Sequence, residues 1–195
     1  MNRAAFLDRD GVINRKAPIG QYVTSWEEMQ MLPDVAQAIS LFNRAGYLVI
    51  VVTNQRSVAK GLITVSELEG IHQRMCDELA RTGASVHEVY YCPHELEPAC
   101  SCRKPRPGML LRAAQAHNID LSASWMIGDS DKDVEAGKNA GCRTLQLLGS
   151  DEPDNGKADA VANSLLEATL KILQRDGVLP IGPHRVRSTA LVSPE

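Results

Sequence analysis

The sequence has no long apolar segment. A transmembrane helix needs about 20 consecutive apolar residues, and charged side chains interrupt the apolar runs of this 195-residue chain well before that length. The N-terminal stretch MNRAAFLDRD reaches the charged segment at 8–10 after only seven residues, so we expect no secretory signal. These absences favour a cytoplasmic protein with no membrane partner.

The sequence also lacks a strong excess of either charge. Its formal net charge is −3 and its isoelectric point is about 6.0, so nothing indicates a nucleic-acid partner or a polybasic membrane patch. A hydrophobic content of 44% and a charged content of 23% are ordinary for a soluble globular protein. The length suits one domain with a sizeable core, which we place at residues 1–177, followed by a C-terminal tail at 178–195.

Short apolar runs alternate with amphipathic stretches along the chain. The run YLVIVVTN at 47–54 is rich in β-branched residues, as expected of a strand covered on both faces. Ser66 and Glu69 have the spacing of a capping box at the start of one helix. The alternation predicts an α/β fold with a mostly parallel sheet and helices on both faces. We expect strands at 4–8, 47–54, 86–92, 124–129, 142–149 and 159–163, and helices at 34–46, 66–83, 108–118, 131–141 and 164–177.

Polar side chains follow the predicted strands at the points where the strands end. Ligands of open parallel sheets bind beyond the carboxyl ends of the strands, so these side chains are candidate site residues. A lone D-x-D pattern is common in surface loops, whereas the whole ordered set is not expected by chance. The strand ends carry Asp8 and Asp10, Thr53 and Asn54, and Asp129, Asp131 and Asp133. Lys104, in a loop shortly before a predicted helix, adds one cation to the set.

These residue types suit phosphoryl transfer. Clustered carboxylates repel one another unless a cation neutralises them, and Mg²⁺ prefers oxygen ligands, usually one or two carboxylates with water and substrate phosphate. A carboxylate can also attack phosphorus and form an aspartyl-phosphate. A lysine, a hydroxyl and backbone N–H groups can stabilise the charge that spreads over the phosphoryl oxygens in the transition state.

Four ordered segments carry a resemblance to a known family. They are FLDRDGV at 6–12, VVTN at 51–54, RKPRPG at 103–108 and IGDSDKD at 127–133. The set resembles the haloacid-dehalogenase-like phosphatase superfamily, and DRDG followed by VIN is similar to its histidinol-phosphatase and heptose-bisphosphate phosphatase branch. The resemblance runs from Phe6 to about Leu148. It implies a Rossmann-like three-layer sandwich with a zinc-binding loop, and the short gap between Asp10 and Pro33 indicates a member without a cap domain.

The resemblance implies roles for the residues at the strand ends. Asp8 is the expected nucleophile, and Asp10 is the expected general acid, which then becomes the base that activates water. Mg²⁺ is expected to bind the Asp8 carboxylate, the Asp10 main-chain carbonyl and Asp129. Lys104 is expected to neutralise charge between Asp8 and the phosphate, and Asp133 to orient the metal site.

Further contacts with phosphate and substrate are expected after the second strand and beside the lysine. The resemblance implies that Thr53 and Asn54 hold the phosphoryl oxygens, while Gln55 and Arg56 are expected substrate contacts. Arg103 is expected to grip a second phosphate with its planar guanidinium. The segment NQRSVAKG at 54–61 departs from the NQSGIARG usual in the branch. Arg56 adds a positive charge there, which leaves the anomer preference open.

Four potential metal ligands are concentrated in the segment CPHELEPACSCRKPRPG at 92–108. These ligands are Cys92, His94, Cys100 and Cys102. Three sulfur atoms and one imidazole suit a structural Zn²⁺ site. A disulfide, a catalytic thiol and an ordinary polar loop are the alternatives, but three cysteines leave one unpaired, and disulfides are rare in the cytoplasm. The branch carries a similar zinc loop, which implies a closed structural site that stiffens the segment presenting Arg103 and Lys104.

The remaining polar and sulfur-containing residues have simpler interpretations. Asp131 is expected to be a charge at a helix N-terminus, and Ser130 is a weaker candidate for the metal site. Cys76 and Cys142 are expected to be small buried apolar residues. The other histidines are expected to lie in the core or on the surface; they are His72, His87, His117 and His184.

The resemblance implies a small phosphorylated sugar as substrate. The leading expectation is removal of the 7-phosphate of D-glycero-D-manno-heptose 1,7-bisphosphate, in the synthesis of a nucleotide-activated heptose for lipopolysaccharide or other surface polysaccharide. Histidinol phosphate is the alternative substrate. A non-catalytic binding protein is disfavoured because the expected catalytic residues are present, and a phosphomutase because no cap would exclude water. No apolar face is left over, so we expect a monomer.

Overall fold

Six parallel strands form one sheet in the computed structural model, which describes residues 1–149, 154 and 156–178. The strands are β1 (Arg3–Leu7), β2 (Tyr47–Asn54), β3 (Glu88–Cys92), β4 (Trp125–Gly128), β5 (Arg143–Leu147) and β6 (Ala160–Ala162). Their order across the sheet is β3-β2-β1-β4-β5-β6. The helices are α1 (Val35–Arg44), α2 (Val65–Arg81), α3 (Gly108–His117), α4 (Asp131–Ala140) and α5 (Leu165–Arg175), with a 3-10 turn η1 (Leu121–Ala123).

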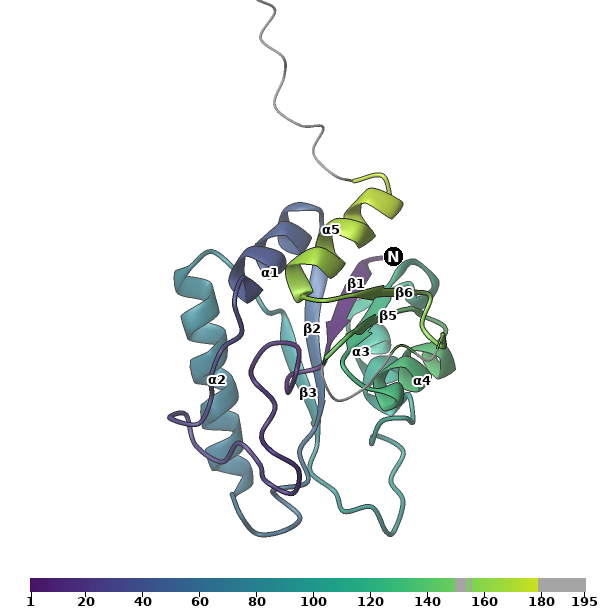
Figure 1. The fold of residues 1–195 in the computed structure, drawn as a ribbon. Helices are drawn as coiled ribbons and strands as arrows, with labels where there is room; N and C mark the ends of the chain where they lie inside the picture. The colour runs from purple at the N-terminus through teal and green to yellow at the C-terminus, as the bar shows by residue number, and fades with distance from the viewer. Residues whose placement is uncertain (150–153, 155, 179–195) are drawn as a thin grey trace, which may run out of the picture.

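Helices cover both faces of the sheet, which gives three layers (Figure 1). On one face, α1, α2 and α5 contribute to one apolar core through residues such as Phe42, Leu68 and Ile172. On the other face, α3 and α4 form a second core through residues such as Met109, Leu110 and Ala136. Alternate residues of β2 enter the two cores, Val49 and Val51 on one side and Ile50 and Val52 on the other, because side chains of a strand alternate between its faces.

The predicted α/β fold is confirmed, and every predicted helix and strand is present within a few residues of its expected bounds. The predicted capping box was wrong. The cap of α2 is Thr64, whose Oγ1 accepts a hydrogen bond from the Glu67 amide at 3.2 Å, while the Glu67 carboxylate accepts one from the Thr64 amide at 2.8 Å. The S/T-x-x-E spacing occurs twice here, two residues apart, so spacing alone does not choose between Thr64 and Ser66. In the tail expected at 178–195, the described part ends at Val178.

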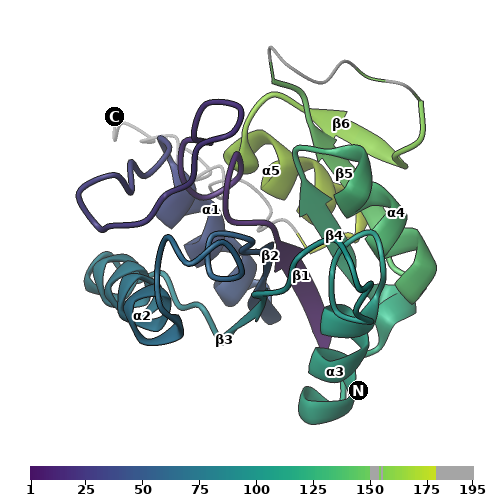
Figure 2. The same ribbon diagram turned by 90° about the horizontal axis from the view of Figure 1, so that it is seen from below.

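The carboxyl ends of β1 and β4 meet at the middle of the sheet. The chain proceeds outward from β1 through β2 to β3, then returns to β4 beside β1 and proceeds outward the other way. Such a reversal of strand order is where open α/β sheets bind their ligands. The loops that follow these strands lie together on one edge of the molecule (Figure 2).

No separate cap domain covers this edge in the part of the chain that the structure describes. Residues 8–34, between β1 and α1, form turns and isolated bridges, and α2 packs its apolar side into the core. The expected capless arrangement is therefore confirmed for these residues. None of the helices among the described residues combines the length and the apolar character needed to cross a bilayer.

Candidate active site

Lys104 lies at the centre of a buried charge cluster below the ends of β1 and β4. Its Nζ is 2.8 Å from Asp8 Oδ1 and 2.6 Å from Asp133 Oδ1, and it donates to the Val52 carbonyl at 2.7 Å. Only 3% of Lys104 is exposed. Burial opposes its charge, but Asp133 and Asp8 outweigh burial and raise the pKa of Lys104. The lysine therefore stays a cation.

Three carboxylates converge beside Lys104. Oxygen atoms of Asp8, Asp129 and Asp133 all lie within 4.8 Å of one another. Burial, opposed by Lys104, raises the pKa of Asp8 to about 7, and burial also raises the pKa of Asp129. A hard divalent cation would favour the charged forms, and Mg²⁺ prefers such oxygen ligands. This donor set fits Mg²⁺.

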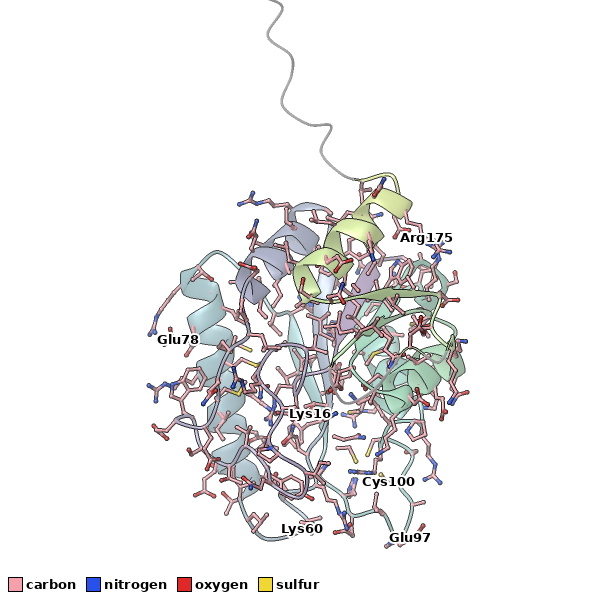
Figure 3. All side chains as sticks on the ribbon, viewed as in Figure 1. Lys16, Lys60, Glu78, Glu97, Cys100 and Arg175 are labelled. Carbon is pink, nitrogen blue, oxygen red and sulfur yellow. The ribbon has the colours of Figure 1, made fainter. Side chains whose placement is uncertain are left out.

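The loop after β1 approaches Asp129 closely. Gly11 has a φ of +91°, and a Cβ at this position would lie 2.2 Å from Asp129 Oδ2, so both the backbone and the space require glycine. Lys16 Nζ contacts the same Oδ2 at 2.8 Å. Figure 3 shows Lys16 near the middle of the view, above Cys100 and Lys60. The loop thus brings a cation against a predicted metal ligand.

Asp10 is held by donors from three directions. Arg9, which is 1% exposed, donates from Nη2 to both carboxylate oxygens, at 2.9 Å and 3.0 Å. Asn14 Nδ2 donates at 2.9 Å and Gln55 Nε2 at 3.0 Å. Although burial opposes the charge, Arg9, Asn14 and Gln55 together lower the pKa of Asp10. Asp10 is therefore ionised in this state.

Arg9 also contacts a buried histidine, His72. Arg9 Nη1 lies 3.2 Å from His72 Nε2. Burial and the positive charge of Arg9 lower the pKa of His72 to about 3, so the ring is neutral and its Nε2 can accept the hydrogen bond. Tyr91 packs against His72 with ring centroids 5.6 Å apart. His72 lies in the core, one of the two places expected from the sequence, but no role was predicted for it or for Arg9. The available signal was an arginine between two aspartates.

Residues at the carboxyl end of β2 and just after it connect this strand to the loops that carry Lys104 and the cysteines. Thr53 is 1% exposed, and its Oγ1 accepts from Gln55 Nε2 at 2.9 Å. The Asn54 side chain forms two bonds with the Lys104 backbone, donating to its carbonyl and accepting from its amide, each at 3.1 Å. Arg56 forms an ion pair with Glu95 of the cysteine loop.

A cavity of about 190 Å³ opens over these groups. Arg103 lines it, and its Nη1 donates to the His94 carbonyl at 3.3 Å. Gln55 and Arg56, which were expected to contact substrate, are not among the lining residues. The lining consists of Asp8, Asp10, Lys16, Thr53, Asn54, Arg103, Lys104, Asp129, Ser130, Lys132 and Asp133.

The four potential zinc ligands also come together. Cys100 Sγ is 3.5 Å from Cys92 Sγ and 3.3 Å from Cys102 Sγ, and His94 Nδ1 is 3.2 Å from Cys102 Sγ. No disulfide joins the three thiols. Sulfur atoms that share one tetrahedral zinc at about 2.3 Å lie about 3.8 Å apart, so the cluster is compact enough to close around one ion. The arrangement fits Zn²⁺.

The secondary candidates have ordinary surroundings. Asp131 lies in the first turn of α4 and forms an ion pair with Lys157 at 2.6 Å. Ser130 is the N-cap of this helix and donates from Oγ to Asp133 Oδ2 at 2.7 Å. Cys142 is buried, as expected, whereas Cys76 is only partly buried. These residues therefore add no further chemistry to the site.

Comparisons with known proteins agree with this geometry. A family model described as HAD-hydrolase-like matches residues 101–168. The D-glycero-beta-D-manno-heptose-1,7-bisphosphate 7-phosphatase of Rhodopseudomonas palustris is 43% identical over 155 residues, covering 76% of this chain and 84% of the relative. The D-glycero-alpha-D-manno-heptose-1,7-bisphosphate 7-phosphatase of Mycobacterium bovis is 35% identical over 173 residues, covering 86% and 90%.

A solved structure of a heptose-bisphosphate phosphatase also resembles this chain. The crystal structure of D,D-heptose 1,7-bisphosphate phosphatase from B. bronchiseptica, complexed with magnesium and phosphate, has a TM-score of 0.81 and 32% identity, and the match covers 89% of this chain and 99% of that one. The predicted superfamily and the phosphatase activity are therefore confirmed. The chain belongs to the family of haloacid-dehalogenase-like phosphatases that includes these heptose-bisphosphate 7-phosphatases.

Proposed function

We propose that the protein is a Mg²⁺-dependent phosphatase that removes the 7-phosphate of D-glycero-D-manno-heptose 1,7-bisphosphate. The observation that carries the proposal is the partly buried Asp8 directly after β1, paired with Lys104 and grouped with Asp129. The names of the relatives support this substrate. The reaction would serve the synthesis of a nucleotide-activated heptose for surface polysaccharide. We expect a monomer that acts in the cytoplasm.

Asp8 is the proposed nucleophile. Its Oδ1 accepts from the Arg9 amide at 2.7 Å and pairs with Lys104, so Oδ2 is the oxygen better placed to attack phosphorus. A new bond forms between this oxygen and phosphorus while the bond to the sugar oxygen breaks. Lys104 and the Thr53 hydroxyl stabilise the phosphoryl oxygens. Mg²⁺, held by Asp8, Asp129 and the Asp10 carbonyl, would further neutralise the transferred charge.

Asp10 is the proposed general acid and base. It would protonate the departing sugar oxygen, then take a proton from the water that hydrolyses the aspartyl-phosphate. The bonds from Arg9, Asn14 and Gln55 keep it ionised before substrate arrives. A phosphate beside it would raise its pKa, since a nearby like charge disfavours the ionised form.

The cysteine loop has a proposed structural role. A zinc ion held by its three sulfur atoms and His94 would have no open position for substrate. Cys102 directly precedes Arg103 and Lys104, so the ion would hold the backbone that presents both cations to the cavity.

The mechanism is tested with Asp8→Asn. Hydrolysis of para-nitrophenyl phosphate in Mg²⁺ should fall by at least about a thousandfold, because the variant lacks the attacking oxygen. Asp131→Asn, which removes the same charge from a partly exposed residue that forms an ion pair with Lys157, should keep wild-type turnover. Equal activity of wild type and Asp8→Asn would defeat the mechanism.

The substrate is tested by comparing kcat/KM for heptose 1,7-bisphosphate and histidinol phosphate. The proposal expects a clear preference for the bisphosphate. A preference for histidinol phosphate would replace the proposed substrate with the alternative, while leaving the phosphatase chemistry in place.

A further inference from the structure

A second cavity, of about 490 Å³, lies beside the reaction cavity that contains Asp8 and Lys104. Its walls come from the loop after β1, the start of α1, the ends of β4 and β5, and the turn before α5. Lys16 and Asp129 line both cavities. The two cavities are therefore neighbours that share one ion pair, and the second has a volume typical of small-molecule sites.

The walls of the second cavity differ in character from those of the reaction cavity. Every described residue that lines the reaction cavity is polar or charged, which suits a phosphorylated sugar. The second cavity has an apolar wall instead, formed by Val12, Leu32, Pro33, Leu147, Leu148 and Leu165. A hydrophilic sugar phosphate would gain little from this wall, whereas an apolar ring would bury its surface there. The second cavity therefore suits a different molecule from the proposed substrate.

Arg15 brings an unmatched positive charge to this apolar space. It lines the second cavity, and within the described residues it forms no ion pair with a carboxylate. The other charged residues of the lining are matched. Lys16 pairs with Asp129 at 2.8 Å, and Asp34 is the N-cap of α1, where the helix dipole favours a negative charge. An acidic group on a ligand would supply the partner that Arg15 lacks.

We propose that the second cavity is a binding site for a small amphipathic anion, a molecule made of an apolar ring system and one acidic group. The ring packs against the apolar wall, and the acidic group pairs with Arg15, whose exposed side chain lies at the rim. Neither the apolar wall nor Arg15 has a role in the proposed reaction. The inference therefore stands apart from the proposed function and is tested without the substrate.

Two fluorescent probes that differ only in an acidic group test the role of Arg15. The probe 8-anilino-1-naphthalenesulfonate has an aromatic body and a sulfonate, and N-phenyl-1-naphthylamine is the same body without the sulfonate. Fluorescence titration of the full chain should show one site, with the sulfonate bound more tightly. Arg15→Gln should weaken sulfonate binding by about fivefold or more, because a charged contact is lost, and should change binding of the neutral probe by less than about twofold. Arg44→Gln, at an exposed position in the last turn of α1, should match wild type.

A larger side chain in the apolar wall tests where the probes bind. Leu148→Trp should fill part of the cavity and weaken binding of both probes by about tenfold or more. Leu111→Trp adds the same ring at an exposed position of α3 and should bind both probes as wild type does. Cooperative thermal unfolding checks that the variants are folded, and Arg15→Gln, at an exposed position, still tests the site if Leu148→Trp does not fold. Wild type that binds neither probe, or binds both with equal affinity, overturns the inference. So does probe binding that folded Leu148→Trp leaves unchanged.

Discussion

At the scale of single residues, His72 shows how a side chain outside the cavity can set the geometry of one inside it. The buried Arg9 guanidinium has one side on Asp10 and the other on His72 Nε2. A protonated ring could not accept this bond and would place two cations together. The neutral state of His72 is therefore coupled to the folded arrangement of Arg9 and Asp10.

This coupling predicts a dependence of stability on pH. The pKa of His72 is about 3 in the folded protein and about 6.5 in an unfolded chain, so the unfolded state binds the extra proton between these values. The stability associated with the neutral His72 is fully present above about pH 6.5. The free energy of unfolding falls by up to about 1.4 kcal/mol per pH unit as the pH drops toward 3. Below that window the contribution is gone.

Urea unfolding at about pH 7.5 and about pH 4.5 measures this contribution. Wild type and the control His87→Gln, at an exposed position, should lose more stability on acidification than His72→Gln, which keeps an acceptor but does not titrate. Identical losses in all three proteins would show that His72 does not titrate as described.

At the scale of elements, the N-terminus of α2 is capped by Thr64, although Ser66 has the same S/T-x-x-E spacing. Thr64→Ala removes the hydroxyl that caps the helix and should cost about 1 kcal/mol of unfolding free energy. Ser66→Ala lies within the first turn and provides the matched control, with an expected change below about 0.5 kcal/mol. Chemical denaturation distinguishes the two; a larger cost for Ser66→Ala would restore the cap expected from the sequence.

The cysteine loop is the second element with a specific prediction. Cys102→Ser should lower bound zinc well below one ion per chain, because one of four ligands is lost. Unfolding free energy should fall by about 2 kcal/mol or more, which is roughly 4–8 °C in Tm, and KM for the bisphosphate should rise as Arg103 loses its support.

Metal analysis, thermal unfolding and kinetics on the same preparation check this result. Cys76→Ser, a cysteine in α2 away from the cluster, should leave all three quantities near wild type. Unchanged zinc content, Tm and KM in Cys102→Ser would exclude the proposed role of the loop.

At the scale of the whole molecule, the last described helix is tied to the centre of the sheet. Asp176, at the end of α5, accepts hydrogen bonds from Tyr47 of β2 and from Trp125 Nε1 of β4 at 3.1 Å, and it pairs with Arg143 of β5 at 2.7 Å. Figure 3 places the neighbouring Arg175 at the upper right of the molecule, away from Lys16. We therefore expect this network to stabilise the fold and to take no part in the reaction.

Asp176→Ala should therefore lower unfolding free energy by about 2–3 kcal/mol, because it leaves buried donors without an acceptor. The kcat/KM of the folded variant should stay at the wild-type value. Glu78→Ala, which removes an exposed ion pair with Arg81, should cost less than about 1 kcal/mol. Denaturation curves and initial rates check both expectations; a loss of kcat/KM in folded Asp176→Ala would contradict this separation of roles.

The order of the elements, the parallel sheet and the main members of the site could be predicted from the sequence. Alternating apolar periods define strands and helices locally, and residues that end parallel strands share one edge. Asp8 and Asp129 could therefore be grouped from the sequence, and the family resemblance added Lys104 to them. The close spacing of the four cysteine and histidine ligands made their cluster equally predictable.

The directions in which the long polar side chains point could not be predicted from the sequence. Arg9 is buried against His72, Arg56 pairs with Glu95, and Lys132 faces the cavity. Each outcome depends on where loops from distant parts of the chain come to lie, and periodicity along the sequence contains no information about that. The periodicity of apolar residues reflects local backbone geometry and burial. The partner of a long charged side chain depends instead on which charged and polar groups the fold brings close to it.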